Sequence, residues 1–179
     1  MIQVIILNGG SSSGKTTIAT CLQAILPSSW LRLGVDTLID AMPASLLTSD
    51  SDAGIEFGAD GSVRPGREFR RLESAWMQGI AAMAHAGARI IIDDVFISGV
   101  DARNRWHAAL ADIPVLWVGV RCDPDIATER ERGRGDRIIG MARLQAQIVH
   151  TGIEYDIEVD TTETPAKECA RLIAKRVGD

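Results

Sequence analysis

The chain has 179 residues, of which 46% are hydrophobic and 24% charged, a composition typical of one ordinary globular domain. Nineteen Lys and Arg against 24 Asp and Glu give a net charge of −5, which argues against binding of nucleic acid or of an acidic membrane. No apolar run approaches the roughly 18 residues of a membrane-spanning helix, and the N-terminus lacks the features of a signal peptide. Three widely spaced cysteines without a C-x-x-C pair fit reduced thiols, so we expect a cytoplasmic protein.

Along the chain, apolar segments typical of strands covered on both faces alternate with segments whose apolar residues have helical spacing. In chain order the predicted elements are strand Ile2–Leu7, helix Ser13–Leu26, strand Trp30–Val35, helix Arg67–His85, strand Ala88–Val95, helix Asp101–Leu110, strand Val115–Val120, a helix starting at Asp123-Pro124, helix Asp136–His150, strand Tyr155–Val159 and a helix starting at Thr164-Pro165.

This alternation predicts an α/β fold with a parallel, doubly wound sheet of five strands flanked by helices. No internal repeat or long linker divides the chain, so we expect a single domain over residues 1–179. Two segments interrupt the pattern: Ala44–Pro65 is polar and contains glycine, and Glu129–Arg137 is dense in arginine. Both are predicted to be loops or mobile flaps.

A phosphate-binding motif stands between the first strand and the first helix. The pattern G-x-x-x-x-G-K-[ST] is matched by Gly9, Gly10, Ser11, Ser12, Ser13, Gly14, Lys15 and Thr16. In such a P-loop, the glycines let backbone N–H groups surround phosphate oxygens at the positive end of a helix. Lys15 is expected to reach the β and γ phosphates, and the Thr16 hydroxyl to ligate Mg²⁺.

The same residues also fit another motif. Gly10 to Gly14 satisfy G-x-S-x-G, the nucleophile elbow of serine hydrolases, with Ser12 as nucleophile. That fold takes part of its oxyanion hole from a loop after an earlier strand. Only eleven residues precede Ser12, which is room for one strand, so the phosphate-binding interpretation is favoured.

Three carboxylates end predicted strands, where doubly wound sheets bind their ligands. Asp36 ends the second strand, and Asp93 and Asp94 end the third. Phosphoryl transfer to an alcohol needs a carboxylate that accepts the hydroxyl proton, and Asp36 is a candidate; its alternative is to cap a helix starting at Thr37. Asp93 or Asp94 resembles the carboxylate that supports Mg²⁺ in P-loop proteins, the alternative being a cap on the next loop.

Two groups of arginines carry concentrated positive charge. The first is predicted to form a flexible lid that closes over the nucleotide and neutralises the transferring phosphoryl group; it comprises Arg130, Arg132, Arg134 and Arg137. Its alternative is a solvated face paired with neighbouring acidic residues, namely Glu129, Glu131 and Asp136. The second group is interpreted as a solvated helix start or as a site for an anionic acceptor, and comprises Arg64, Arg67, Arg70 and Arg71.

Several nucleotide-protein signatures are absent. No glutamate stands beside the Asp93-Asp94 doublet to polarise a water, and the chain has neither an N-K-x-D nor an L-S-G-G-Q-type motif. Phosphoryl transfer to an acceptor is therefore favoured over a molecular switch or motor. A positional argument places the adenine base near Thr161–Thr164, after the fifth strand.

Over nearly its whole length the chain resembles the chloramphenicol phosphotransferases of antibiotic-producing actinomycetes. Besides the P-loop, the resemblance is carried by long unusual strings, namely residues 5–12, 34–43, 88–96, 115–123, 134–137 and 158–162. It implies an adenylate-kinase-like P-loop fold with an arginine-rich lid. It also implies ATP-dependent phosphorylation of a primary hydroxyl of chloramphenicol, which gives self-resistance.

The resemblance also implies roles for individual residues. Asp36 matches the general base, Lys15 the phosphate-binding lysine, and Arg134 and Arg137 the arginines of the lid. The chain departs from the family in two places: Thr16 replaces a serine, and Ala44–Ala53 differs and looks longer. An acceptor other than chloramphenicol, such as a nucleoside-type antibiotic, therefore stays open.

The sequence thus predicts an O-phosphotransferase that uses ATP and Mg²⁺ on a hydroxylated small molecule. Two alternatives remain: a metabolic kinase for a sugar acid or nucleoside on the same scaffold, and a non-catalytic ATP-binding regulatory module. A homo-oligomer is compatible with the sequence, which leaves the oligomeric state open.

Overall fold

A five-stranded parallel sheet forms the centre of the protein, as expected for the predicted α/β class. The computed structural model describes residues 1–47, 53–58, 60–134 and 140–178. The strands are arranged in the order β2-β5-β1-β6-β7 and every neighbouring pair is parallel. Their bounds are β1 (Val4–Asn8), β2 (Trp30–Gly34), β5 (Arg89–Asp94), β6 (Val115–Arg121) and β7 (Ile157–Asp160).

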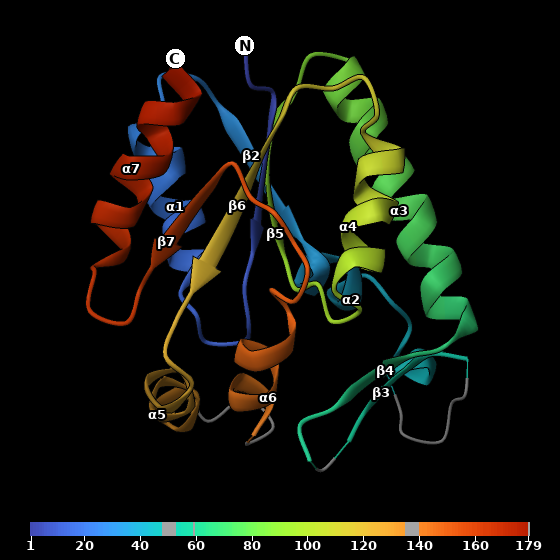
Figure 1. Cartoon of the computed structure of the whole chain (residues 1–179). Helices are drawn as coiled ribbons and strands as arrows, with labels where there is room; N and C mark the ends of the chain where they lie inside the picture. Colours follow the sequence, from blue (N-terminus) through green and yellow to red (C-terminus); the bar gives the residue numbers. More distant parts are fainter. Residues whose placement is uncertain (48–52, 59, 135–139, 179) are drawn as a thin grey trace.

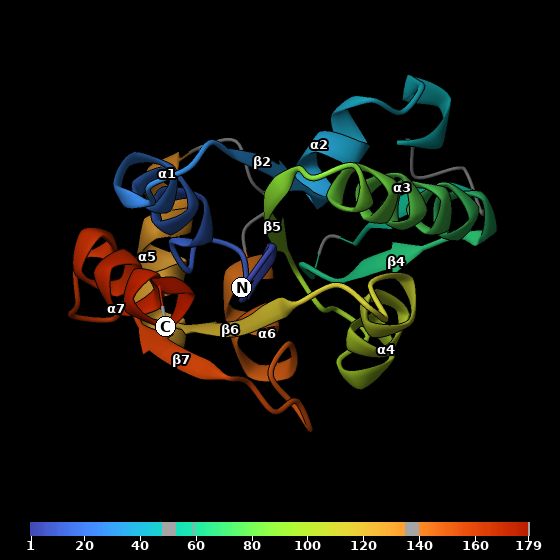
Figure 2. The ribbon, with the colours of Figure 1, turned by 90° about the horizontal axis from the view of Figure 1, so that it is seen from above.

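Helices cover both faces of this sheet (Figures 1 and 2). One face packs against α1 (Lys15–Ile25) and α7 (Ala166–Gly178), and the other against α3 (Arg67–His85) and α4 (Val100–Ala109). Side chains of a strand alternate between faces, so the apolar residues of β1 supply both cores: Ile5 and Leu7 belong to one, and Val4 and Ile6 to the other. Two-sided burial explains why β1 is apolar without alternation.

The remaining elements gather beyond the carboxyl ends of the strands, below the sheet in Figure 1 and away from both chain termini. They are the short helix α2 (Val35–Asp40), the helices α5 (Pro124–Arg134) and α6 (Met141–Ile148), and the antiparallel pair β3 (Ile55–Phe57) and β4 (Val63–Pro65). This is the edge at which doubly wound sheets bind ligands.

The segment Ala44–Pro65 is more ordered than its composition predicts. Its described part contains a 3₁₀ helix (Ala44–Leu46) and the β3–β4 hairpin, so the prediction of a loop is wrong there. Three-residue strands are too short to produce a visible alternation, and such a hairpin needs packing for stability. Ile55 supplies that packing by joining a small core with Leu38 and Phe69.

The arginine-rich segment Glu129–Arg137 is helical as far as Arg134, so the loop predicted for it is wrong over residues 129–134. Residues 135–139 lie outside the described part, and the helix predicted from Asp136 begins at Met141 where it is described. Gly133 lowers helix propensity by only about 1 kcal/mol. The helix start predicted at Asp123 is confirmed: its carboxylate accepts hydrogen bonds from the next backbone N–H groups at 2.8 and 3.3 Å.

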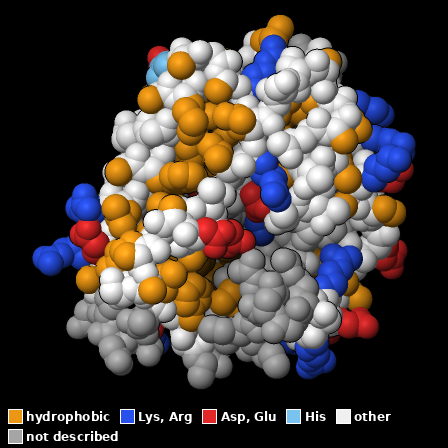
Figure 3. Space-filling model, turned by 180° about the vertical axis from the view of Figure 1, so that it is seen from behind, with side chains coloured by type: hydrophobic (Ala, Val, Ile, Leu, Met, Phe, Trp, Pro, Cys, Tyr) orange, Lys and Arg blue, Asp and Glu red, His pale blue; other side chains and the backbone are white. Residues whose placement is uncertain are grey.

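The face of the molecule opposite to that of Figure 1 carries hydrophobic areas as well as charged groups. In the view from behind, acidic and basic groups lie beside one another and beside hydrophobic groups (Figure 3). Among the described helices, none is long and apolar enough to cross a membrane.

Candidate active site

The backbone of the predicted P-loop is shaped by residues that accept unusual conformations. Ser12 and Gly14 have φ angles of 58° and 88°, in the left-handed region that favours glycine. A Cβ atom at Gly9 would lie 2.5 Å from the carbonyl oxygen of Val120, so the loop passes close to β6 only because this position has no side chain.

Two hydroxyl groups in this loop have no hydrogen-bond partner among the described residues. Ser12 Oγ and Ser13 Oγ are buried and make no hydrogen bond within the described chain. Burying a hydroxyl without a hydrogen-bond partner costs free energy. Phosphate oxygens would accept hydrogen bonds from both hydroxyls. The loop residues therefore fit a bound phosphate group.

The Lys15 side chain lies along the same loop. Only 6% of Lys15 is exposed, and its Nζ donates a 2.9 Å hydrogen bond to the Gly10 carbonyl. The ammonium is also 3.9 Å from Asp93 Oδ1. The positive charge is thereby held beside the Gly10–Ser11 end of the loop.

The two aspartates at the end of β5 point in opposite directions, as successive strand residues do. Asp93 Oδ2 accepts a 2.6 Å hydrogen bond from Thr16 Oγ1. Asp94 instead accepts hydrogen bonds from Trp106 Nε1 at 2.5 Å and from its neighbour Val95 N at 2.7 Å. Burial raises the pKa of Asp94 to about 6. The sequence left open which of the two aspartates supports Mg²⁺. In the structure, Asp93 is the one of the two whose carboxylate contacts the P-loop.

The pair Thr16 and Asp93 has the chemistry that Mg²⁺ prefers, because both supply oxygen ligands. The described residues contain no cluster of three or more acidic, His or Cys side chains that could hold a metal alone. Mg²⁺ in nucleotide sites is usually bound by few protein oxygens together with phosphates and waters. The residues present therefore fit a magnesium–nucleotide complex.

Asp36 lies in the first turn of α2, which begins at Val35 with Gly34 in the N-cap position. The expectation that Asp36 ends a strand is thus wrong by two residues, and so is the alternative that it caps a helix starting at Thr37. A side chain at Gly34 would collide with the Asp93 carbonyl, so β2 lies close to β5 at this point. The exposed Asp36 side chain lines the same cavity as the P-loop.

This cavity has a volume of about 540 Å³ and extends from the P-loop to α3 and the β3–β4 hairpin. Its P-loop end is polar, with Lys15, Thr16 and Asp93. The other end is largely apolar and is lined by Val35, Ile39, Ile55, Phe57, Val63, Phe69, Met77 and Ile97.

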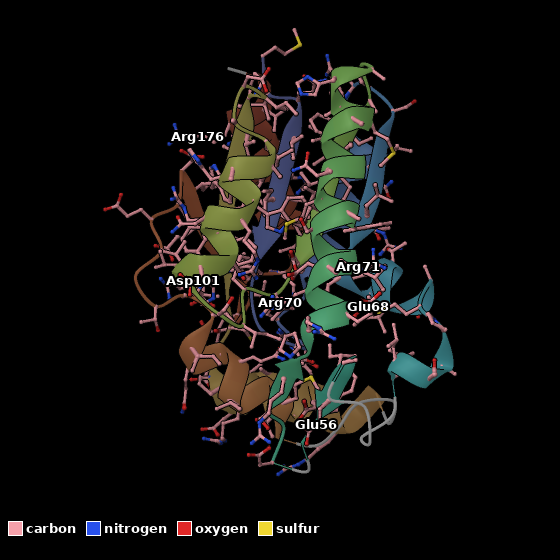
Figure 4. All side chains as sticks on the ribbon, turned by 90° about the vertical axis from the view of Figure 1, so that its right-hand side faces the viewer. Glu56, Glu68, Arg70, Arg71, Asp101 and Arg176 are labelled. Atoms are coloured by element: carbon pink, nitrogen blue, oxygen red, sulfur yellow. The ribbon has the colours of Figure 1, made fainter. Side chains whose placement is uncertain are left out.

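The arginines around the start of α3 separate into two environments. Arg70 Nη1 lies 2.8 Å from Glu73 Oε2, which is also 3.4 Å from Arg105 Nε, and all three residues line the cavity. Arg71 pairs with Glu68 on another side of α3, away from Arg70 (Figure 4). The interpretation as a solvated helix start therefore suits Arg71, whereas the Arg70 side chain is 33% exposed and lines the cavity.

The predicted lid arginines are only partly described. Arg130 donates a 2.7 Å hydrogen bond to the Thr161 carbonyl, and Thr161 Oγ1 donates one of 2.8 Å to Ser13 O. Arg132 is exposed. Arg134 ends α5, but its side chain lies outside the described part, as does the whole of Arg137.

One of the three acidic residues named as alternative partners of these arginines, Glu131, makes other contacts. Glu131 is 1% exposed, and its carboxylate accepts hydrogen bonds of 2.8 Å from Gly140 N and Ala142 N at the start of α6. Glu131 therefore connects α5 to α6, and among the described residues it pairs with no arginine.

One residue of this site escaped the sequence analysis. Gln145 of α6 is 4% exposed, lines the cavity and accepts a 2.7 Å hydrogen bond from Ser11 N. Its only signal is its position, because it lies four residues after the buried Met141 on the inner face of α6. A polar residue at an apolar position of a helix can indicate a buried hydrogen bond.

Comparison with known proteins shows the family to which the chain belongs. Residues 2–178 match the model of the family described as chloramphenicol phosphotransferase-like protein. A protein of Mycobacterium tuberculosis H37Rv, provisionally named O-phosphotransferase Rv2636, is 34% identical over 184 residues, which cover 94% of this chain and 79% of that protein.

Solved structures show the same fold. A sugar kinase of Janibacter sp. HTCC2649 superposes with a TM-score of 0.70 at 17% identity, over 99% of this chain and 95% of that one. The tunicamycin resistance protein of Deinococcus radiodurans superposes with a TM-score of 0.66 at 20% identity, over 98% and 95%. Because the family model matches residues 2–178, the chain belongs to the chloramphenicol phosphotransferase-like proteins and is a P-loop phosphotransferase.

Proposed function

We propose that this enzyme transfers the γ-phosphoryl group of ATP, with Mg²⁺, to a hydroxyl of chloramphenicol or a related antibiotic and so confers resistance. One observation carries the proposal: a single cavity is lined by the P-loop at one end, by Asp36 on its wall and by apolar side chains at the other end. Nucleotide and acceptor could therefore meet within it.

The residues of the P-loop would bind and orient the nucleotide. The backbone N–H groups of the loop and the hydroxyls of Ser12 and Ser13 would contact phosphate oxygens, and Lys15 would neutralise charge on the β and γ phosphates. Thr16 and Asp93 would hold Mg²⁺, which when bound supplies charge stabilisation to the phosphates. We place the adenine beside Thr162–Thr164, which line a second hollow, and Arg134 and Arg137 over the phosphates.

Asp36 would orient the acceptor hydroxyl and accept its proton as the oxygen attacks the phosphorus atom. Asp36 lines the same cavity as Lys15 and Thr16 of the P-loop and as the apolar residues of the other end, which supports this role.

The apolar end supports an acceptor with a sizeable apolar part. Eight apolar residues of this end line the cavity, and the free energy of burial grows with the apolar surface removed from water. A sugar acid would leave this wall without an apolar partner. The Arg70–Glu73–Arg105 cluster would hydrogen-bond to polar groups of the acceptor.

Mass spectrometry tests the proposal directly. Purified protein is incubated with Mg-ATP and, separately, with chloramphenicol, other hydroxylated antibiotics, sugar acids and nucleosides. We expect one added phosphoryl group on an antibiotic. Transfer to a sugar acid or nucleoside alone would make the protein a metabolic kinase, and no transfer to any compound would count against the proposed acceptors.

The role of Asp36 is tested with the acceptor that this screen identifies. Asp36→Asn should fold and bind ATP but lose about 100-fold or more in kcat, because general base catalysis contributes about 10²–10⁴. The matched control is Asp112→Asn, since this carboxylate is 78% exposed and outside the cavity. A kcat of Asp36→Asn close to that of the control would exclude Asp36 as the base.

A further inference from the structure

The orientation of the Gln145 side-chain amide is determined by its neighbour. A backbone N–H can only donate, so the atom that accepts the hydrogen bond from Ser11 N must be the oxygen Oε1. The Nε2 group therefore points away from Ser11. No hydrogen bond from Nε2 to another described residue is present, although 96% of the residue is buried.

The surroundings of Gln145 identify the part of the P-loop that it faces. A Cβ atom at Gly10 would be 3.2 Å from Gln145 Cβ, so α6 lies directly against the Gly10–Ser11 end of the loop. The Lys15 ammonium is held at this same end by the Gly10 carbonyl. Thr161 instead lies at the other end, beside Gly14.

The position of Lys15 indicates the direction in which the phosphate groups of a bound nucleotide would run along the loop. The lysine of a P-loop contacts the β and γ phosphates, which places these groups near Gly10 and Ser11. From there the cavity continues to Asp36 and the apolar wall. Gln145 thus stands beside the expected position of the terminal phosphate. Its side chain lines the cavity, and its Nε2 group, which carries two N–H donors, donates to no described residue.

We propose that Gln145 Nε2 donates a hydrogen bond to a γ-phosphoryl oxygen and thereby lets the enzyme distinguish ATP from ADP. This inference rests on the proposed use of ATP. It adds a residue of α6 to the phosphate site, and it assigns both ends of the amide: Oε1 holds the loop and Nε2 holds the nucleotide. Glu131, which anchors the start of α6, keeps this helix in place.

The test compares two nucleotides without any acceptor. Calorimetry measures the Kd of Mg-ADP and of Mg-AMPPNP, a non-hydrolysable triphosphate, for the wild type and for two variants. Gln145→Glu keeps an oxygen for Ser11 N but puts negative charge where Nε2 stood. Gln145→Met has a similar volume and removes both functions. The control Gln147→Glu makes the same charge change on the exposed side of α6.

We expect the preference for AMPPNP over ADP to fall about tenfold or more in Gln145→Glu, because hydrogen bonds to charged groups are strong and are replaced here by repulsion. The preference for AMPPNP should fall less in Gln145→Met, and it should be unchanged in Gln147→Glu. Thermal melting verifies that each variant is folded.

The failures are distinguishable. If the wild type binds neither nucleotide, the proposed function is wrong. If the wild type binds AMPPNP but Gln145→Glu keeps the wild-type preference, the inference is wrong. If Gln145 only holds the loop, Gln145→Glu should have the wild-type Kd values, and Gln145→Met should bind Mg-ADP and Mg-AMPPNP more weakly by the same factor. If Gln145→Glu does not fold, the preference of Gln145→Met decides: it falls under the inference and is unchanged under the loop-holding role.

Discussion

Thr16 and Asp93 are joined by a hydrogen bond of 2.6 Å although they lie 77 residues apart in the chain. Thr16 is the second residue of α1 and Asp93 the last but one of β5, and the pairing of β1 with β5 brings them together. The next residue, Asp94, belongs to a different environment on the opposite face of the strand. The two neighbouring carboxylates thus have different hydrogen-bond partners, and we expect variants of each to behave differently.

For Asp93, we expect substitution by asparagine to weaken the effect of Mg²⁺ on nucleotide binding by about 10–100-fold, the usual cost of disturbing groups around a metal. Calorimetry of ATP with and without Mg²⁺ measures this effect. Asp94→Asn is the matched control and should keep the Mg²⁺ dependence, since its side chain contacts Trp106 instead of Thr16. An equal loss in both variants would contradict the assignment of Asp93 to the metal.

For Asp94, we expect a pH-dependent contribution to stability. Burial raises its pKa from 3.8 to about 6, so between these values the folded protein binds a proton that the unfolded chain has released. Stability from this group therefore falls as pH rises through the window from about 4 to about 6, by about 3 kcal/mol at most.

Urea unfolding at several pH values checks this expectation. The free energy of unfolding of Asp94→Asn, measured relative to the wild type, should increase between pH 4 and pH 6, because the variant has no proton to lose there. Parallel curves for the two proteins would show that Asp94 titrates normally.

Two glycines should respond oppositely to alanine. At Gly9, a Cβ atom would lie 2.5 Å from the Val120 carbonyl, so Gly9→Ala should destabilise the protein by about 1–3 kcal/mol and abolish nucleotide binding. At Gly79 in α3, a Cβ atom meets nothing within 4 Å, and Gly79→Ala should stabilise the helix by about 0.5–1 kcal/mol. Thermal unfolding and ATP titration of both variants measure these effects. Unimpaired ATP binding by Gly9→Ala would contradict the tight approach of the loop to β6.

Thr161 connects three parts of the site, and its loss should affect both stability and nucleotide binding. The buried hydroxyl has one hydrogen, which the carbonyls of Ser13 at 2.8 Å and Arg121 at 3.1 Å share. Thr161→Val has the same shape without these bonds, so we expect a loss of about 1–3 kcal/mol and weaker binding of ATP. The control Thr151→Val changes an exposed position and should alter neither quantity. Equal behaviour of the two valine variants would exclude the link between Thr161 and the loop.

Much of the fold could be predicted because its signals are local. The P-loop is a contiguous motif, and the strand and helix periods of β1, α3 and β5 reflect burial on a regular element. The β3–β4 hairpin was not predictable, because its strands are short and the packing of Ile55 against Phe69, a residue of α3, is what stabilises it. The helical course of residues 129–134 also escaped prediction, because the buried contacts of Glu131 with the start of α6 outweigh weak local propensity.

The sequence by itself determined the α/β class, the P-loop and the pair Asp93 and Asp94 at the end of β5. Only the tertiary structure decided which of two adjacent aspartates faces Thr16, which arginine near the start of α3 lines the cavity, and that Gln145 reaches Ser11. The physical reason is that a motif specifies chemistry within a few residues. The direction of a side chain, by contrast, depends on strand pleating and on helix packing between segments that are distant in the chain.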